Sequence, residues 1–594
     1  MIVSPVAVLA AGLFAKVAAA ASLCRNQPGD PDYPTDDDWT QLNSTVDGRL
    51  VAAVPTAKWC ADVGCSQTEW ESSNLRATLP GSTVVNNWEQ DYGTGTGNDS
   101  SLCLLNATSS CGQGNVVLYA INATQPEHLQ AGVRFASQHN IRVVMRASGH
   151  DYLGRSTAKN ALLLWTHYFQ NISFTDNFIV DGKSAGPAVT VGSGVGLESY
   201  YAAASAQGRA VLGGSAGTVA PAGGWGQGAG HSVYSPIFGL GADNALEYNI
   251  VTANGTLVTA NEVSHPDLFW AVRGGGGGSW GVIVNATFPT FPLFNSTIHQ
   301  VTLIANSTEL SGSMMATHAR HIFDWDDIRA GAYFYMEASE FGSLVSLSTV
   351  FANISGEEAI SRMAPLLTDL RALGVNVSND ITVTGDANVI VRNADWAIEE
   401  TVLNMTTADA PTTIIPFRDD IAGFNLVMSS RFIPEDVYRN DPDSIGDMYT
   451  KVLDLGIGAV SGHLVAGGKV AENAGVNNSV NPRWRTAKTH IILSYSWEDG
   501  TTPPSVVQEI RHNLTYVATP ILSAITKQDT PGSYSSEGDV LEPDFKNVFY
   551  GENYARLSEI KSAYDPEDLF IVGAGVHSDL WSADGNCRVN ATSV

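Results

Sequence analysis

The residues with the clearest chemical potential lie in a short loop, RASGHDYLGRS, which spans 146–156. Its small residues let the backbone approach a phosphate closely, and successive backbone N–H groups can together bind an anion. His150 stands in the middle of this loop. Imidazole is a nucleophile that can carry a covalent adduct. A packed, hydrogen-bonded histidine is the plainer interpretation, but the neighbouring glycines and basic residues favour a functional site.

A second glycine-rich segment, GGSAGTVAPAGGWGQGAGH, spans 213–231 and contains two misleading motifs. The G-x-S-x-G pattern at 213–217 matches the nucleophile elbow of hydrolases, which must lead into a helix. We expect no helix in the Thr-Val-Ala-Pro-Ala-Gly-Gly that follows. The G-x-G-x-x-A pattern at 224–229 lacks the flanking strand and helix of a nicotinamide site. The sequence therefore predicts neither a serine hydrolase nor a Rossmann dehydrogenase, and leaves a flexible glycine loop as the alternative.

A third segment, DLFWAVRGGGGGSWGV, spans 267–282. Flexible linkers are built from serine and polar residues without aromatic anchors. Here tryptophans stand on both sides of the glycine run and Arg273 precedes it. This pattern is therefore not that of a linker.

The elements that must position these loops are readable from hydrophobic periodicity. The apolar run at 116–121 predicts a strand, and the sequence returns to a strand at 141–145. Between them, Thr124 and Glu127 predict a capping box, with Pro126 in the first turn of a helix. Further predicted elements are strands at 188–195, at 248–258 with a turn at Asn254-Gly255, at 279–292 and at 491–495, and helices at 357–373 and 553–563.

Length and charge restrict the function. A chain of 594 residues exceeds the size of one domain. With Lys+Arg 32 and Asp+Glu 60, the net charge is 32 − 60 = −28. Such a chain is a poor ligand for nucleic acid or an anionic membrane, because both are bound by clustered Lys and Arg. We expect neither as a partner, while the sequence does not address the oligomeric state.

The chain carries the marks of a secreted glycoprotein. Residues 1–21 combine an apolar run with small alanines and predict a signal peptide, with a buried N-terminal helix as the alternative. No later apolar run is long enough for a membrane span. Asn-x-Ser/Thr sites occur along the whole chain, at Asn43, Asn98, Asn106, Asn122, Asn171, Asn254, Asn285, Asn295, Asn306, Asn353, Asn376, Asn404, Asn477, Asn513 and Asn590.

The six cysteines are even in number, and an oxidising compartment makes disulfides the expected outcome. Sequence alone does not fix the pairing. Short spacings favour Cys60–Cys65 and Cys103–Cys111, which would leave Cys24–Cys587 to join the two ends. No histidine pair stands at zinc-finger spacing, and no metal site is predicted.

Taken together, the segments RASGHD, GGWGQGAGHS, GLGADNALEYNIVTANG, DLFWAVRGGGGGSWGVI and VFYGENYARLSEIKSAYDPEDLF resemble the vanillyl-alcohol-oxidase and p-cresol-methylhydroxylase superfamily of FAD enzymes. They are most similar to its berberine-bridge-enzyme-like oxidases. The cysteine-containing N-terminal segment and the length resemble the fungal isoamyl-alcohol-oxidase branch. The likeness is strong over 115–292 and 545–572 and weak between them.

The resemblance implies an α+β fold in which a PCMH-type FAD-binding domain of two α/β subdomains joins an α+β substrate domain built on an antiparallel sheet with helices. The corresponding division is a cysteine-containing segment at 22–114, the FAD domain at 115–292, the substrate domain at 293–510, and a C-terminal segment at 511–594 that packs back on the FAD domain.

The resemblance also assigns residues to the flavin. His150 would carry FAD through the flavin 8α-methyl group, and because 215–218 holds no cysteine, one covalent link is expected. The other residues implied to bind the cofactor are Arg146, Ala147, Ser148, Gly149, Asp151, Ser156, Gly217, Thr218, Gly224, Gly228, Gly230, Val282 and Asn553.

The catalytic base is less closely matched. The family places a Tyr-x-Asn element near the substrate hydroxyl, whereas this chain has Tyr534-Ser535-Ser536. Tyr534 and Glu537 are therefore the candidate proton acceptors. A flavin accepts hydride from a carbon bearing a hydroxyl while a base takes the hydroxyl proton. The expected function is a secreted, FAD-dependent alcohol oxidase that reduces O2 to H2O2. The alternatives are a carbohydrate oxidase, a secondary-metabolite oxidative cyclase, or a non-catalytic glycoprotein that kept the fold.

Overall fold

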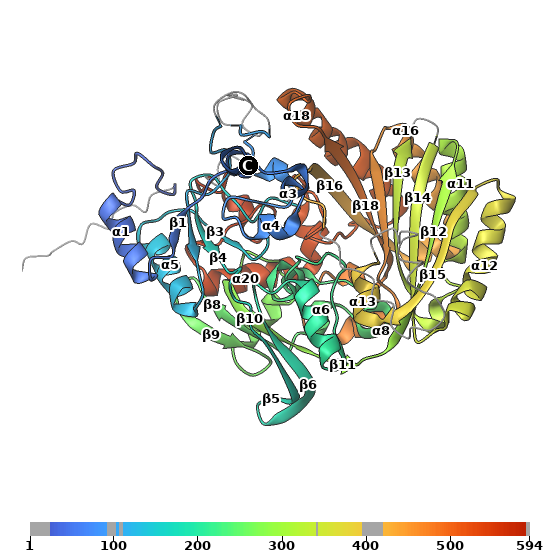
Figure 1. Ribbon diagram of the computed structural model, residues 1–594, viewed down its shortest axis with the longest axis horizontal. Coiled ribbons are helices and arrows are strands. Elements are labelled where there is room, and N and C mark those ends of the chain that lie inside the picture. The colour runs from blue at the N-terminus through green and yellow to red at the C-terminus, as the bar shows by residue number, and fades with distance from the viewer. Residues whose placement is uncertain (1–23, 92–101, 106–110, 340–341, 395–419, 590–594) are drawn as a thin grey trace, which may run out of the picture.

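A computed structural model describes residues 24–91, 102–105, 111–339, 342–394 and 420–589 (Figure 1). The predicted signal peptide and the glycosylation sites at Asn98, Asn106, Asn404 and Asn590 lie outside this part of the chain. Within it, no helix combines the length and the apolar character that crossing a bilayer requires. The mixture of helices and antiparallel sheets confirms the predicted α+β class.

The first sheet carries the loop that contains His150. Its order is β1-β2-β4-β3, with β2, β4 and β3 parallel to one another. Helix α5 connects β2 to β3 and buries its apolar side on them. The bounds are β1 Leu50–Ala52, β2 Tyr119–Asn122, α5 Pro126–Gln138, β3 Val143–Arg146 and β4 Leu162–Trp165.

The predicted strand–helix–strand unit is confirmed, but the capping box is wrong. Gln125, not Thr124, is the N-cap, and its side chain makes no capping hydrogen bond. The Thr124 backbone N–H instead points at His128 Nδ1, 3.4 Å away. Pro126 opens the helix as expected, since a missing N–H costs nothing there.

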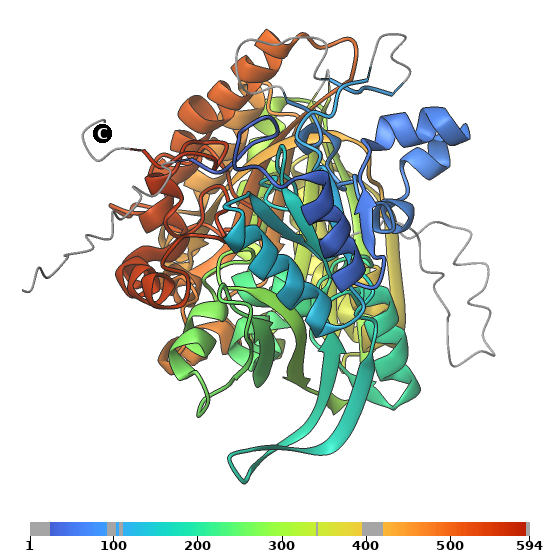
Figure 2. The same ribbon diagram turned by 90° about the vertical axis from the view of Figure 1, so that its left-hand side faces the viewer.

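A second, antiparallel sheet has the order β5-β6-β10-β8-β9. The predicted turn at Asn254-Gly255 connects β8 to β9, with Gly255 at φ +73°. The β5–β6 hairpin projects from the body of the molecule in both views (Figures 1 and 2). The bounds are β5 Ile172–Val180, β6 Lys183–Gly192, β8 Glu247–Val251, β9 Leu257–Ala260 and β10 Val282–Pro289, with a separate pair of β7 Arg209–Ala210 and β11 Phe291–Pro292.

The third sheet is antiparallel, with seven strands in the order β15-β12-β14-β13-β17-β18-β16. Helices α11, α12 and α16 cover one face, and the other face turns toward the first two sheets (Figure 1). The bounds are β12 Asn295–Ala305, β13 Gly331–Ser339, β14 Gly342–Ala352, β15 Asn376–Asp386, β16 Asn425–Pro434, β17 Ala459–Leu464 and β18 Ala487–Trp497, with α11 Thr308–His321, α12 Gly356–Ala372 and α16 Pro442–Asp454.

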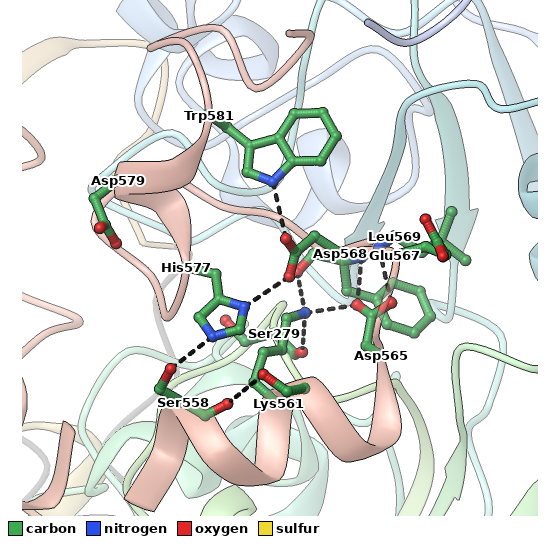
Figure 3. Close-up of polar contacts among 12 residues, drawn as sticks. Ser279, Ser558, Lys561, Asp565, Glu567, Asp568, Leu569, His577, Asp579 and Trp581 are labelled. Carbon is green, nitrogen blue, oxygen red and sulfur yellow. Dashed lines mark hydrogen bonds and ion pairs between the residues drawn. The ribbon is translucent and has the colours of Figure 1, made fainter. Parts of the chain in front are cut away.

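In the C-terminal segment, α18 Pro504–Asn513 and α19 Thr519–Ile525 pack on the side of the seven-stranded sheet, and α20 Tyr554–Tyr564 returns to the first half of the molecule. Its anchor is Lys561, whose fully buried ammonium donates to the carbonyls of Ser279 (2.8 Å) and Phe570 (2.7 Å) and pairs with Asp565 at 2.6 Å (Figure 3). The helix is thereby fixed to the residue that follows the glycine run.

Three disulfides constrain this fold. The structure pairs Cys60 with Cys65, Cys103 with Cys111 and Cys24 with Cys587. These are the pairings that the spacings favoured, and the last one joins the two ends of the described chain. The division into four segments stays a prediction.

Candidate active site

The three glycine-containing loops meet around one cavity. Its wall consists mainly of small residues and backbone, with a few polar side chains from the C-terminal segment. The residues that line it include Arg146, Ala147, Ser148, Gly149, His150, Asp151, Ser156, Ala222, Gly223, Gly224, Gln227, Gly277, Gly278, Val282, Tyr534, Ser536 and Glu537.

The loop after β3 is held by its own polar residues. Asp151 accepts the backbone N–H groups of Leu153 (3.0 Å) and Arg155 (2.9 Å) and pairs with the Arg155 guanidinium at 2.7 Å. Gly149 has φ +94°, a conformation that side chains disfavour. The loop is therefore fixed with its backbone open to the cavity.

Arg146 connects this loop to the N-terminal segment. Its guanidinium donates to the Leu79 carbonyl at 2.8 Å and to the Ser82 carbonyl, and burial lowers the pKa of the guanidinium to about 10. The cysteine-containing segment is thus bonded directly to the first residue of the cavity loop.

The second glycine loop corrects one prediction. Residues expected to avoid helix form a π-type turn at Pro221–Trp225, followed by a single α-turn at Gly226–Gly228. Gly223 keeps non-helical angles within it. A Cβ on Gly226 would lie 2.6 Å from the Pro221 carbonyl, so close packing imposes a turn that propensity alone does not favour.

His150 is oriented by the cysteine-free segment 215–218. Its Nε2 hydrogen-bonds to Thr218 Oγ1. Thr218 also donates its backbone N–H to Asp420 (3.2 Å) and its hydroxyl to Ser73 (3.2 Å). Thr218 is held by residues distant in sequence, and its hydroxyl thereby fixes the imidazole at the cavity wall.

Five of the predicted cofactor residues lie outside the cavity lining. Gly217 packs against Arg392, and Gly228 against Tyr534 and Ser536. The Asn553 amide donates to the Val480 carbonyl at 3.1 Å. The other two are Thr218 and Gly230. Their direct contact with FAD stays a prediction.

Tyr534 and Glu537 line the cavity together. The Gly230 N–H donates to the Tyr534 hydroxyl at 3.3 Å, and burial together with the Glu537 charge raises the pKa of Tyr534 to about 12. Burial alone would raise the pKa of Glu537, but His231, His490 and His463 outweigh it and hold that pKa well below its usual value.

These three histidines were missed by the sequence analysis. His231 ends the second glycine loop, whereas His463 and His490 are cross-strand partners on β17 and β18. Burial lowers the pKa of both strand histidines. No local spacing connects them, and only the sheet register brings them to Glu537.

A second polar constellation has the appearance of a hydrolase triad (Figure 3). Ser558 Oγ lies 2.7 Å from His577 Nε2, and His577 Nδ1 lies 2.8 Å from Asp568. Ser558 sits inside α20, where the helix uses the neighbouring backbone N–H groups, so no oxyanion donors accompany it. Trp581 also donates to Asp568 at 3.1 Å, which makes this network an anchor for the C-terminal segment.

Comparison with known proteins identifies the family. The protein-family model described as "FAD binding domain" matches residues 117–261, and the family model "Berberine and berberine like" matches residues 533–577. An uncharacterized FAD-linked oxidoreductase of Arthroderma benhamiae is 33% identical, over 95% of this chain and 96% of its own length. The chain belongs to the berberine-bridge-enzyme-like, FAD-linked oxidoreductases.

Further relatives agree with this membership. The VAO-type flavoprotein oxidase VAO615 of Thermothelomyces thermophilus is 30% identical over 95% of each chain. The crystal structure of a VAO-type flavoprotein from Myceliophthora thermophila has a TM-score of 0.80 at 28% identity, over 95% of this chain and all of that one. Berberine bridge enzyme from Eschscholzia californica, at 15% identity, shares the fold with a TM-score of 0.64, over 91% of this chain and 99% of that one.

The cavity fits the cofactor of this family. FAD needs backbone N–H groups and small residues along its pyrophosphate, and the cavity wall offers both on three loops. A Cβ on Gly224 would meet no protein atom within 4 Å, which leaves this backbone open to a ligand. The expected FAD cofactor is thereby confirmed, whereas similarity to isoamyl alcohol oxidase stays a prediction.

Proposed function

We propose that this protein is a secreted oxidase that removes a hydride from a carbon bearing a hydroxyl group, with FAD linked covalently to His150 alone. Bound FAD supplies the two-electron acceptor, so that an alcohol and O2 give a carbonyl compound and H2O2. The carrying observation is that Tyr534 and Glu537 line the same cavity as the His150 loop.

The chain's own residues position the reaction. Tyr534 and Glu537 are the polar pair at which the substrate hydroxyl can leave its proton. The Tyr534 ring packs edge-on against His231 and Trp484, both at 5.7 Å between centroids. Its orientation is thus fixed by packing, as a positioned acid–base group requires.

Two further parts of the proposal, that O2 accepts the electrons and that the protein is secreted, are supported by other observations. The name of the Thermothelomyces relative describes an oxidase, and the three disulfides with the Asn-x-Ser/Thr sites along the chain suit an oxidising compartment.

The test is a screen of primary, secondary and sugar alcohols for peroxide release, followed by anaerobic stopped-flow reduction with the best substrate. Tyr534→Phe should slow flavin reduction by about 10²–10⁴-fold with an unchanged flavin spectrum. Tyr200→Phe is the matched control, because the Tyr200 hydroxyl is equally buried but lies outside the cavity lining. A Tyr534→Phe enzyme within about threefold of the wild-type rate would move the proton acceptor to Glu537. Absence of peroxide with every alcohol would refute the proposed activity.

A further inference from the structure

Three histidines and a glutamate converge behind the cavity wall. His231, His463, His490 and Glu537 each place one ligand-type atom within 4.8 Å of all the others. Of the four, only Glu537 lines the cavity. The histidines therefore face Glu537 from the side away from the cofactor site.

Two of the histidines are poorly satisfied by the protein itself. His463 and His490 are 5% and 0% exposed, and within the described residues the Glu537 carboxylate is the polar group beside both rings; neither Nε2 atom has a hydrogen-bond partner there. A neutral imidazole carries one N–H, and a buried donor without a hydrogen bond destabilises the folded protein. Two such rings side by side indicate a bound group that contacts a nitrogen of each ring without forming a hydrogen bond to it.

The spacing of the four groups matches a coordination sphere. From Glu537 Oε2, His231 Nε2 lies at 3.2 Å, His490 Nδ1 at 3.2 Å and His463 Nδ1 at 3.7 Å. Metal–nitrogen bonds of about 2.05 Å in a tetrahedron place neighbouring ligand atoms about 3.3 Å apart. The three separations from Glu537 are close to this value, and the others, which reach at most 4.8 Å, require the imidazoles to move inward around a central ion.

The backbone holds the ligands rigidly. His463 and His490 are directly opposite each other on adjacent strands of the seven-stranded sheet. Phe432 and Trp484 lie beside His490, with ring centroids at 5.4 and 6.0 Å, and exclude water from the cluster. An apolar surround of this kind strengthens and tunes metal sites.

We propose that His231, His463, His490 and Glu537 form a closed binding site for a first-row divalent metal, with Zn²⁺ as the best fit. Imidazole and carboxylate are ligands that zinc accepts, and four protein ligands leave no open position, as in structural zinc sites. The ion joins the second glycine loop, the seven-stranded sheet and the C-terminal segment. With Glu537 acting as a ligand, Tyr534 is the member of the cavity pair left to accept the substrate proton.

The experiment uses the full-length, flavin-loaded protein without a histidine tag. Elemental analysis after desalting should find about one zinc per chain, and His463→Gln/His490→Gln should reduce it below about 0.1. His318→Gln, which alters a buried histidine outside the cluster, should keep the metal. Anomalous diffraction at the zinc edge should place a peak between the four side chains, and this measurement does not require the double variant to fold.

Two outcomes would overturn the site. One is wild-type protein that contains no metal and takes up no added Zn²⁺ in competition with a chromophoric chelator. The other is metal that the double variant retains in full. A protein that oxidises alcohols but neither contains nor takes up Zn²⁺ would refute the metal site alone, whereas a zinc-loaded protein inactive on every alcohol would refute the proposed activity alone.

Discussion

Removal of the Lys561 ammonium should destabilise the protein far more than removal of an exposed lysine. Lys561 is fully buried and serves three acceptors, namely Asp565 and the carbonyls of Ser279 and Phe570. Lys561→Met keeps the side-chain volume but leaves the Asp565 carboxylate as a buried charge, whose remaining partners are the backbone N–H groups of Leu569 and Phe570.

Breaking one partner of a buried ion pair costs about 3–5 kcal/mol. If the cooperative unit has about 150–250 residues, each kcal/mol shifts the thermal midpoint by about 2–4 °C, which gives about 6–20 °C for Lys561→Met. The assay is thermal unfolding followed by flavin fluorescence at one fixed scan rate. A change in flavin fluorescence should accompany unfolding as the covalently held flavin becomes exposed, because Ser279 directly follows the glycine run that lines the cavity.

The matched control is Lys546→Met. Lys546 pairs with Asp579 at 2.7 Å, but both side chains are substantially exposed, so about 0–1 kcal/mol is expected. Lys561→Met/Asp565→Asn should recover part of the loss, since it removes the unpaired charge. A Lys561→Met protein that melts within about 2 °C of wild type would refute this account of the anchor.

Three further changes test the cavity and the core. Thr218→Val removes the hydroxyl that contacts His150 and should slow covalent flavin attachment by about 2–10-fold, whereas Thr218→Ser should not. The rate is measured as the flavin retained by the protein after acid precipitation, and equal rates for the two variants would contradict this role of Thr218. Gly224→Leu should empty the cavity of flavin without unfolding the protein, because its side chain enters space free of protein atoms, while Gly475→Leu, equally open but away from the cavity, should keep normal flavin absorbance. Burial lowers the pKa of His318 to about 4. The stability that the neutral imidazole contributes is therefore complete above pH 6.5, its ordinary pKa, and about 3 kcal/mol of it is lost as the pH falls toward 4. His318→Leu should make the thermal midpoint less dependent on pH over that range, and an unchanged dependence would refute this role of His318.

Local signals predicted the parts of the site that depend on local backbone. The 146–156 loop follows its strand as the apolar pattern requires, and nine of the predicted cofactor residues line the cavity. Their function follows from residue type and immediate neighbours, and both are visible in one stretch of sequence.

Tertiary contacts determined the rest. The predicted capping box is absent because the Thr124 N–H points at His128 instead. Tight packing at Gly226 accounts for the helical turn that the sequence did not predict. The histidine cluster depends on the register of β17 against β18, which no local pattern specifies. The Lys561 anchor likewise joins residues 282 positions apart.

Peptide mapping tests whether a single covalent bond joins His150 to FAD. The purified protein is precipitated in acid, digested, and its flavin-labelled peptides are sequenced by mass spectrometry. We expect flavin to stay with the protein and to be found on one labelled peptide, which carries the modification on His150. Flavin that is released entirely by acid, or that is found on a cysteine or on any residue other than His150, would contradict it.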